Sequence, residues 1–220
     1  MKTTQTKGRF NHLGLAGAFA GLALAATALA DDAGQWDHHR MELSSTEFSD
    51  GGVLPISAIF ESATSSGTNA CSVDGSTGGN TSPELSWRHA PPGTRTFAVV
   101  MYDTTASFTH WGIYNISREA RGLPANAGTP TSTDGQQIED DFYLGTNGYN
   151  GPCPPAEQPY VHHYVFTVYA LDKALQLPAS TNFPPVAETL FQALIRAGQE
   201  GHILASASIT GLYSIVPGTD

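Results

Sequence analysis

The sequence predicts a mainly β domain with one helix near the C-terminus and long loops, and a β-sandwich fits this pattern best. Three observations support the prediction. Runs rich in β-branched and aromatic residues recur along the chain, polar segments rich in Gly and Pro separate them, and one late stretch has helical periodicity. The expected strands are Arg95–Asp103, His110–Ile116, His162–Tyr169 and Ile203–Ile215.

Residues 1–30 match a cleavable export signal. Lys2, Lys7 and Arg9 form a positive start, a small-residue apolar run follows, and Ala28-Leu29-Ala30 is an A-x-A cleavage pattern. An uncleaved membrane anchor is the alternative, because the apolar run approaches spanning length. The favoured interpretation is a periplasmic or secreted protein, with no stable membrane insertion after cleavage.

The expected mature chain, residues 31–220, is strongly acidic. Loss of the signal removes three of the 10 Lys and Arg residues and none of the 20 Asp and Glu residues, which leaves a formal net charge of −13. Such a surface repels nucleic acid and anionic lipid headgroups at long range, so no nucleic-acid partner is expected. A local pocket can still hold an anion, because salt screens the global charge beyond about 8–10 Å.

Residues 31–40 are expected to form an N-terminal tail, and residues 41–220 a single domain. Asp37, His38 and His39 in the tail could bind a metal ion, but such a terminal cluster is more often solvated polar sequence. We therefore assign neither a metal nor a cofactor.

Polar, glycine-rich and proline-rich segments mark the loops. They are Ser62–Ser82, the turn Ala90–Gly93, Leu123–Gly151 and Tyr149–Pro159. The first of them contains Cys71 and the last contains Cys153. In an exported chain such a pair usually forms a disulfide, and closing a loop of about 80 residues predicts about 4 kcal/mol of stabilisation. Free thiols or a metal pair are the alternatives, and no C-x-x-C spacing supports either.

Two of the expected strands carry polar side chains at one end. Because side chains alternate between the faces of a strand, Asp103 shares a face with Met101, and His162 and Tyr164 share a face with Phe166. An imidazole and a phenol at the end of an apolar stripe indicate the wall of a pocket. The alternative is a strand that simply emerges from the core into water.

The helix is expected between a cap at Asn182 and a stop at Gly198, with Pro184 and Pro185 in its first turn. Its predicted buried stripe consists of Leu190, Phe191, Leu194 and Ile195. The final strand has small residues at its centre, where another element is expected to pack closely.

Polar groups at three strand ends form the candidate site: Asp103, His110 beside Trp111, and His162 with Tyr164. Convergent polar groups on an apolar scaffold are typical of small-ligand sites. Asp103 can accept a hydrogen bond from an imidazole and favour its protonated form, which attracts a phosphate or a carboxylate. Independent capping of each strand is the alternative.

Two enzymatic interpretations are weaker. A serine hydrolase would be expected to show a G-x-S-x-G elbow, which the sequence lacks. A zinc enzyme could use Asp103, His110 and His162, but no H-E-x-x-H spacing supports it. P-loop and Rossmann fingerprints are also absent from the sequence.

An ordered set of short segments runs through the chain. The set is Asn80-Thr81-Ser82-Pro83-Glu84-Leu85-Ser86-Trp87, Pro92-Gly93-Thr94-Arg95-Thr96-Phe97, Tyr102-Asp103, His110-Trp111, Tyr114-Asn115-Ile116, Gly148-Tyr149-Asn150-Gly151-Pro152, Pro154-Pro155, His162 to Leu171, and Ala205 to Gly211. In this order the segments resemble the phosphatidylethanolamine-binding protein (PEBP) family, in its bacterial Raf kinase inhibitor-like YbhB/YbcL branch. The resemblance covers roughly residues 41–214.

The resemblance implies a central antiparallel β-sandwich with a small pocket for phosphate-like anions. It assigns the pocket to Asp103, His110, Pro155, His162 and Tyr164. It also implies that the protein acts as a modulator, which binds lipids, nucleotides or protein partners such as kinases and proteases. We therefore expect a binding protein rather than an enzyme. A hydrolase that uses one of the two histidines as a base is the alternative, although no activated nucleophile is visible.

Two departures from the family pattern stand out. The family segment D-P-D-A-P appears here as Asp103-Thr104-Thr105-Ala106-Ser107, which predicts a more open pocket with an altered anion preference. The family segment H-R-Y appears as His162-His163-Tyr164. Because His163 points to the opposite face from His162, this second change should not alter the pocket directly.

Overall fold

A six-stranded sheet forms the centre of the computed structural model, which describes residues 40–139, 147–178 and 185–218. Its strands in spatial order are β2 (Gly52–Val53), β9 (Ile203–Tyr213), β8 (His162–Leu171), β4 (Thr96–Asp103), β5 (Phe108–Ser117) and β7 (Gln136–Gln137). Neighbouring strands are antiparallel, except that β2 runs parallel to β9.

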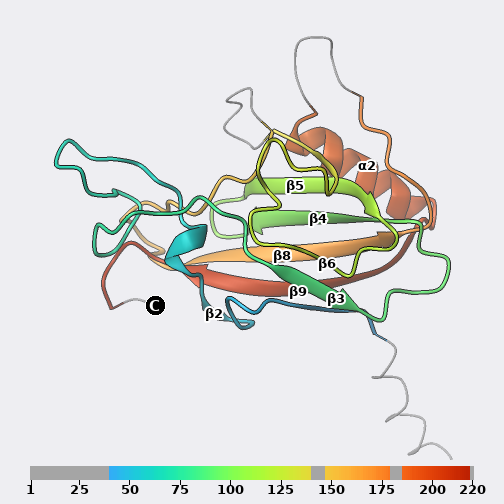
Figure 1. Cartoon of the computed structure of the whole chain (residues 1–220), viewed down its shortest axis with the longest axis horizontal. Helices are drawn as coiled ribbons and strands as arrows, with labels where there is room; N and C mark the ends of the chain where they lie inside the picture. The colour runs from blue at the N-terminus through green and yellow to red at the C-terminus, as the bar shows by residue number, and fades with distance from the viewer. Residues whose placement is uncertain (1–39, 140–146, 179–184, 219–220) are drawn as a thin grey trace, which may run out of the picture. The chain divides into compact units, whose positions relative to one another are not determined.

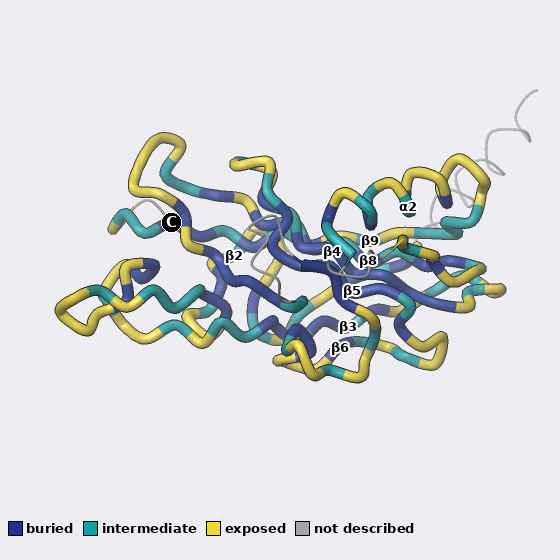
Figure 2. The backbone as a smooth tube through the Cα atoms, turned by 90° about the horizontal axis from the view of Figure 1, so that it is seen from above, coloured by how far each residue is buried: buried dark blue, intermediate teal, exposed yellow. Residues whose placement is uncertain are grey.

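A second sheet and a helix cover the two faces of the large sheet. The small antiparallel sheet consists of β1 (Glu42–Ser44), β3 (Leu85–Arg88) and β6 (Gly122–Leu123), and α2 (Ala187–Gln199) packs on the opposite face. Figure 1 shows β3 and β6 in front of the large sheet, and Figure 2 shows the helix, the large sheet and the small sheet as successive layers. The predicted mainly β sandwich with one late helix is confirmed.

Alternation along β4 separates two apolar cores. Phe97 and Met101 pack with Trp87 in the core between the sheets, whereas Val100 packs with Leu190 beneath α2. Because alternate residues of a strand point to the same side, Asp103 continues the face that points between the sheets. The middle strands are accordingly buried along most of their length (Figure 2).

The helix begins and ends later than predicted. It follows Val186, whose side chain makes no capping hydrogen bond, and Gly198 lies inside its last turn. Gly201 instead adopts a left-handed conformation, with φ of 76°, just after the helix, and this conformation suits a helix end. The predicted cap Asn182 and the predicted first-turn residue Pro184 lie outside the described residues, and Pro185 precedes the helix.

The buried stripe of α2 is narrower than predicted. Leu190 and Leu194 are buried, whereas Ile195 is 51% exposed. The sheet contacts one side of the helix, so positions spaced by three or four residues are covered and the adjacent row is not.

Short strands were missed by the sequence prediction. The predicted loop Leu123–Gly151 contains β7, and the four strands β1, β2, β3 and β6 have at most four residues each. Such lengths are too short to show a period of two. Residues 1–30 and the tail up to His39, with its Asp37, His38 and His39, lie outside the described residues. Within the described ranges, none of the helices is long and apolar enough to cross a membrane.

The expected disulfide is present. Cys71 and Cys153 are bonded, with their Cα atoms 4.7 Å apart, and the phenol of Tyr213 donates a hydrogen bond of 3.0 Å to the Cys71 carbonyl. The bond ties the loop that follows η2 (Ile56–Ala58) to the segment that leads into β8.

Candidate functional site

Asp103 and His162 form a buried hydrogen-bonded pair at adjoining ends of β4 and β8. The distance from His162 Nδ1 to Asp103 Oδ2 is 2.6 Å, and the two residues are only 5% and 2% exposed. Because a carboxylate can only accept, this bond places a proton on Nδ1 and turns Nε2 away from Asp103. Asp103 thereby fixes both the orientation and the tautomer of the imidazole.

The second oxygen of Asp103 organises the turn between β4 and β5. Oδ1 accepts hydrogen bonds from the backbone N–H groups of Thr105, at 2.8 Å, and Ala106, at 3.1 Å. A side chain that closes its own turn in this way is a common use of Asp. Asp103 therefore couples the turn to the His162 ring.

His110 reaches the same space through a β-bulge. Met101 lies opposite Trp111 and Tyr102 lies opposite Thr109, so His110 is the extra residue of β5. In such a bulge two consecutive residues oppose one partner, which explains how the His110 ring contacts the inward-facing Tyr164 although Trp111 is also buried between the sheets. His110 Nδ1 donates to the Asn150 carbonyl at 2.8 Å.

Tyr164 lies between the two histidines. Its ring centroid is 5.2 Å from that of His110, in an edge contact, and 6.3 Å from that of His162, in a stacked arrangement. Burial, and then the Asp103 carboxylate, raise the pKa of Tyr164 above its ordinary value. The phenol therefore stays protonated and keeps a hydrogen-bond donor at the site.

The structure thus brings four of the five predicted pocket residues together: Asp103, His110, His162 and Tyr164. The fifth, Pro155, is exposed on the loop that leads into β8, and its neighbour Pro154 is buried. Within the described ranges, no group of three or more His, Cys, Asp and Glu side chains is arranged to hold a metal ion, so the zinc arrangement considered above is not found.

The two departures from the family pattern contact each other. Thr105 Oγ1 accepts a hydrogen bond from the His163 backbone N–H at 3.0 Å and lies 3.3 Å from His163 Nδ1. His163 is exposed and alternates with the buried His162 and Tyr164, as predicted. The paired changes therefore lie on the outer side of the turn that Asp103 closes.

Sequence reasoning missed Asn150 and Thr105. Asn150 acts through its backbone carbonyl, and the Thr105 backbone N–H binds Asp103. Neither role depends on a side-chain type, so no motif of residue types could reveal it. The membership of Asn150 in the segment Gly148–Pro152 was the only available signal.

Comparison with known proteins gives consistent matches. A family model described as phosphatidylethanolamine-binding protein matches residues 44–214. The UPF0098 protein YbcL of Escherichia coli is 34% identical over 183 residues, which cover 79% of this chain and 87% of YbcL. The UPF0098 protein YbhB of the same species is 34% identical over 181 residues, covering 79% of this chain and 100% of YbhB.

One solved structure and one further relative, matched over a shorter stretch, add to these matches. The crystal structure of E. coli YbcL, described as a member of the mammalian PEBP family, superimposes with a TM-score of 0.62 at 31% identity and covers 80% of this chain and 98% of YbcL. LppC of Mycobacterium tuberculosis, whose name includes the word lipoprotein, is 36% identical over 119 residues, or 53% of this chain and 55% of LppC.

Proposed function

Because the chain belongs to the phosphatidylethanolamine-binding protein family, we propose that it binds a small anion, such as a phosphate-type headgroup, between His110 and His162. Asp103 and Tyr164 orient the ligand-binding groups, and Pro155 lies at the rim. The observation that carries the proposal is the buried Asp103–His162 hydrogen bond beside a protonated Tyr164.

The chemistry of the donors favours an oxyanion. Nδ1 of His162 contacts Asp103, and Nε2 faces away from that carboxylate. The Tyr164 phenol offers an O–H. A neutral imidazole that donates from Nδ1 has no N–H at Nε2, so the anion is bound by the protonated His162 ring together with the phenol. Hydrogen bonds from such a charged donor on an otherwise apolar scaffold are about twice as strong as neutral ones.

The same proposal includes export and a regulatory role. The N-terminal sequence pattern, the disulfide and the name of the relative LppC support a periplasmic or secreted location. A protein partner, such as a kinase or a protease, fits the modulators that the family resemblance suggested. Anion binding would then decide whether that partner can dock.

A hydrolase is the second candidate, and one observation favours it. A histidine held by a buried carboxylate is the base and orienting group of many hydrolases. However, no hydroxyl or thiol of the described part of the chain hydrogen-bonds to the His162 ring, so a hydrolase would have to activate water or a nucleophile brought by the substrate.

A thermal-shift titration tests the binding proposal. Phosphate, phosphoethanolamine and acetate are each titrated against the wild-type protein and His162→Gln. A ligand at 100 times its Kd should raise the Tm of the wild type by about 5–10 °C and leave that of His162→Gln unchanged. His163→Gln is the matched control, since it removes the adjacent, outward-facing imidazole and should keep the full shift.

The outcomes separate the two functions. If none of the three anions shifts the wild type, or if both variants lose the shift equally, the proposed pocket is wrong. Turnover of generic ester or peptide substrates that His162→Gln abolishes and His163→Gln retains would instead establish the hydrolase.

A further inference from the structure

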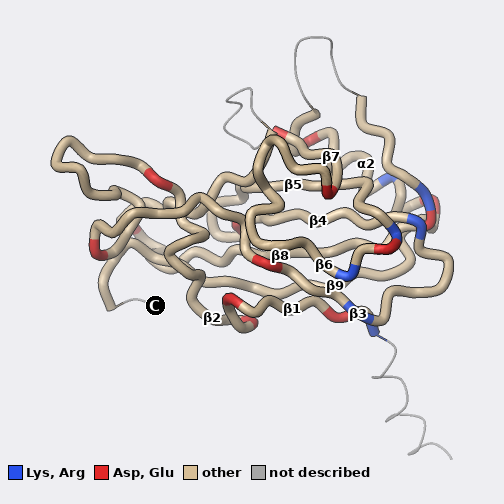
Figure 3. Tube along the Cα trace, in the orientation of Figure 1, with Lys and Arg blue, Asp and Glu red and all other residues tan. Residues whose placement is uncertain are grey.

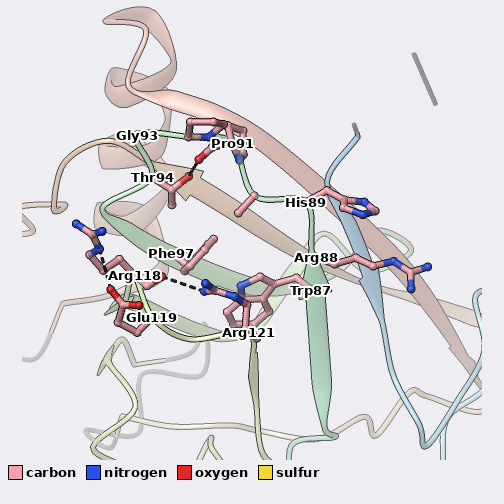
Figure 4. A pocket seen from close by; sticks show the side chains of 12 residues that line it. Trp87, Arg88, His89, Pro91, Gly93, Thr94, Phe97, Arg118, Glu119 and Arg121 are labelled. Atoms are coloured by element: carbon pink, nitrogen blue, oxygen red, sulfur yellow. Dashed lines mark hydrogen bonds and ion pairs between the residues drawn. The ribbon is translucent and has the colours of Figure 1, made fainter. Parts of the chain in front are cut away.

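A cavity lies at the opposite end of β4 from the histidines. It has a volume of about 330 Å³, and its lining includes Trp87 of β3, Pro91 of the following turn, Phe97 at the start of β4, and Arg121 just before β6. From Phe97 to Asp103 the strand advances about 20 Å, so this cavity, the Trp87 pocket, is separate from the proposed anion site. Figure 4 shows its lining.

An unpartnered hydrogen-bond donor lies in the wall of the Trp87 pocket. Across residues 40–139, 147–178 and 185–218, Trp87 Nε1 is the one buried side-chain nitrogen or oxygen atom without a hydrogen-bond partner. Trp87 itself is only 3% exposed. Leaving such a donor unsatisfied is costly, because it has lost water without gaining an acceptor. The surrounding protein supplies no acceptor for the indole N–H, which leaves this donor available to a ligand.

The same wall carries positive charge. Three arginines, Arg88, Arg118 and Arg121, line the pocket against one acidic residue, Glu119. Arg88 pairs with Glu42 at 2.5 Å and Arg118 with Glu119 at 3.0 Å. Arg121 instead donates to the carbonyls of Arg118 and Ala120 and has no carboxylate partner among the described residues, so it is the arginine of the wall whose charge is not paired. In Figure 4 the Arg121 guanidinium and the Trp87 indole point toward the same space.

The rest of the molecule reinforces this charge. All seven Lys and Arg residues outside residues 1–39 gather at this end of the sheets (Figure 3), although the whole sequence carries a net charge of −10. The apolar part of the wall is formed by the rings of Trp87 and Phe97, whose centroids are 5.1 Å apart, and by Pro91. The pocket thus combines a cationic rim, one indole donor and an apolar wall.

We propose that the Trp87 pocket is a second ligand site, which takes a small organic oxyanion: a carboxylate or a phosphate attached to an aromatic or other apolar group. The oxyanion accepts a hydrogen bond from the Trp87 indole N–H and forms an ion pair with Arg121. The planar guanidinium of arginine matches the geometry of a carboxylate and of a phosphate. The apolar group packs on Phe97 and Pro91. The rim arginines are exposed, so their long side chains can take up other rotamers and let an incoming anion reach the indole.

The indole N–H gives a direct spectroscopic test. Benzoate and phenyl phosphate are titrated into the ¹⁵N-labelled protein, and the indole resonance of Trp87, assigned with Trp87→Phe, is followed. Both anions should shift this resonance saturably, and benzamide, which has the same shape without the charge, should not. The Kd should rise about tenfold in Arg121→Gln.

Two variants control for charge and for the other site. Arg196→Gln removes the same charge from α2, outside the pocket, and His162→Gln alters only the proposed anion site; both should keep the wild-type Kd within about twofold. The proposal is overturned if neither anion shifts the resonance saturably, if benzamide shifts it equally, or if Arg121→Gln and Arg196→Gln weaken binding by the same factor.

Discussion

Asp103 uses its whole carboxylate. One oxygen accepts a hydrogen bond from the imidazole N–H of His162, and the other accepts hydrogen bonds from two backbone N–H groups of the following turn. All three partners are donors, so the side chain must present acceptors only. An amide of the same size would direct an NH₂ group at one of these donors; facing His162, it would force the imidazole into its other tautomer, with the proton on Nε2.

We expect Asp103→Asn to lower the free energy of unfolding by about 2–4 kcal/mol at pH 7, because it removes the charge-assisted hydrogen bond to His162 and either forces that ring into its other tautomer or leaves a buried backbone donor unsatisfied. Urea denaturation followed by circular dichroism measures the loss.

The chain contains a matched control for this substitution. Asp172 and His202 form a second Asp–His pair at 2.8 Å, but their side chains are 38% and 29% exposed. Asp172→Asn should cost less than about 1 kcal/mol, because water replaces the lost contact. Equal costs for the two substitutions would show that burial of the Asp103 pair has no energetic consequence.

At the scale of elements, Glu84 joins β3 to the segment that leaves β1. Its carboxylate accepts hydrogen bonds from the Thr46 backbone N–H, at 2.9 Å, from the Thr46 hydroxyl, at 3.0 Å, and from the Ser86 hydroxyl. Burial alone would raise the pKa of Glu84, but the hydrogen bonds from Ser86 and Thr46 outweigh it and lower the pKa below its ordinary value of 4.5. The ionised carboxylate therefore stabilises the small sheet.

We expect this stabilisation to depend on pH in a defined direction. Because the folded-state pKa is lowered, the contribution is complete above the unfolded-state pKa and is lost as the pH falls through the folded-state value. Glu84→Gln should lower the Tm by about 2–4 °C at pH 7, and the difference from the wild type should shrink as the pH falls below about 4.

Scanning calorimetry between pH 7 and pH 3 measures this difference. Glu157→Gln removes an equal charge from an exposed loop and should leave the Tm unchanged throughout. A Glu84→Gln difference that stays constant down to pH 3 would mean that ionisation of Glu84 contributes nothing.

At the scale of the whole molecule, the disulfide connects segments that are far apart in the sequence. The bonded cysteines are separated by 82 residues, and β3, β4, β5 and β6 all lie between them. Joining such distant positions removes many conformations from the unfolded chain, so most of the central fold is stabilised by one covalent bond.

We expect the double substitution Cys71→Ala with Cys153→Ala to lower the free energy of unfolding by about 4 kcal/mol and the Tm by about 8–16 °C. Mass spectrometry of the native wild-type protein after alkylation without reductant should show no added alkyl group. Two additions would contradict the disulfide.

The sequence predicted the regular parts of the structure and missed those set by interruptions. His162 and Tyr164 were placed correctly because β8 pairs with β4 without a register shift along its length. His110 was assigned to the site because it opens an expected strand, and the family resemblance agreed; alternation could not have placed its side chain, since the bulge breaks it. The Trp87 pocket could not be predicted, because turns and short strands from distant parts of the sequence build it.

Because β5 contains an extra residue, the site depends on the number of residues in this strand as well as on their types. Trp111 is fixed in the core between the sheets, and His110 shares that side because the two residues oppose one partner, Met101. In a strand one residue shorter, regular alternation would turn the side chain before Trp111 toward the helix, even with every remaining residue unchanged. Relatives that differ by a single insertion or deletion in β5 should therefore be compared by register before their histidines are equated.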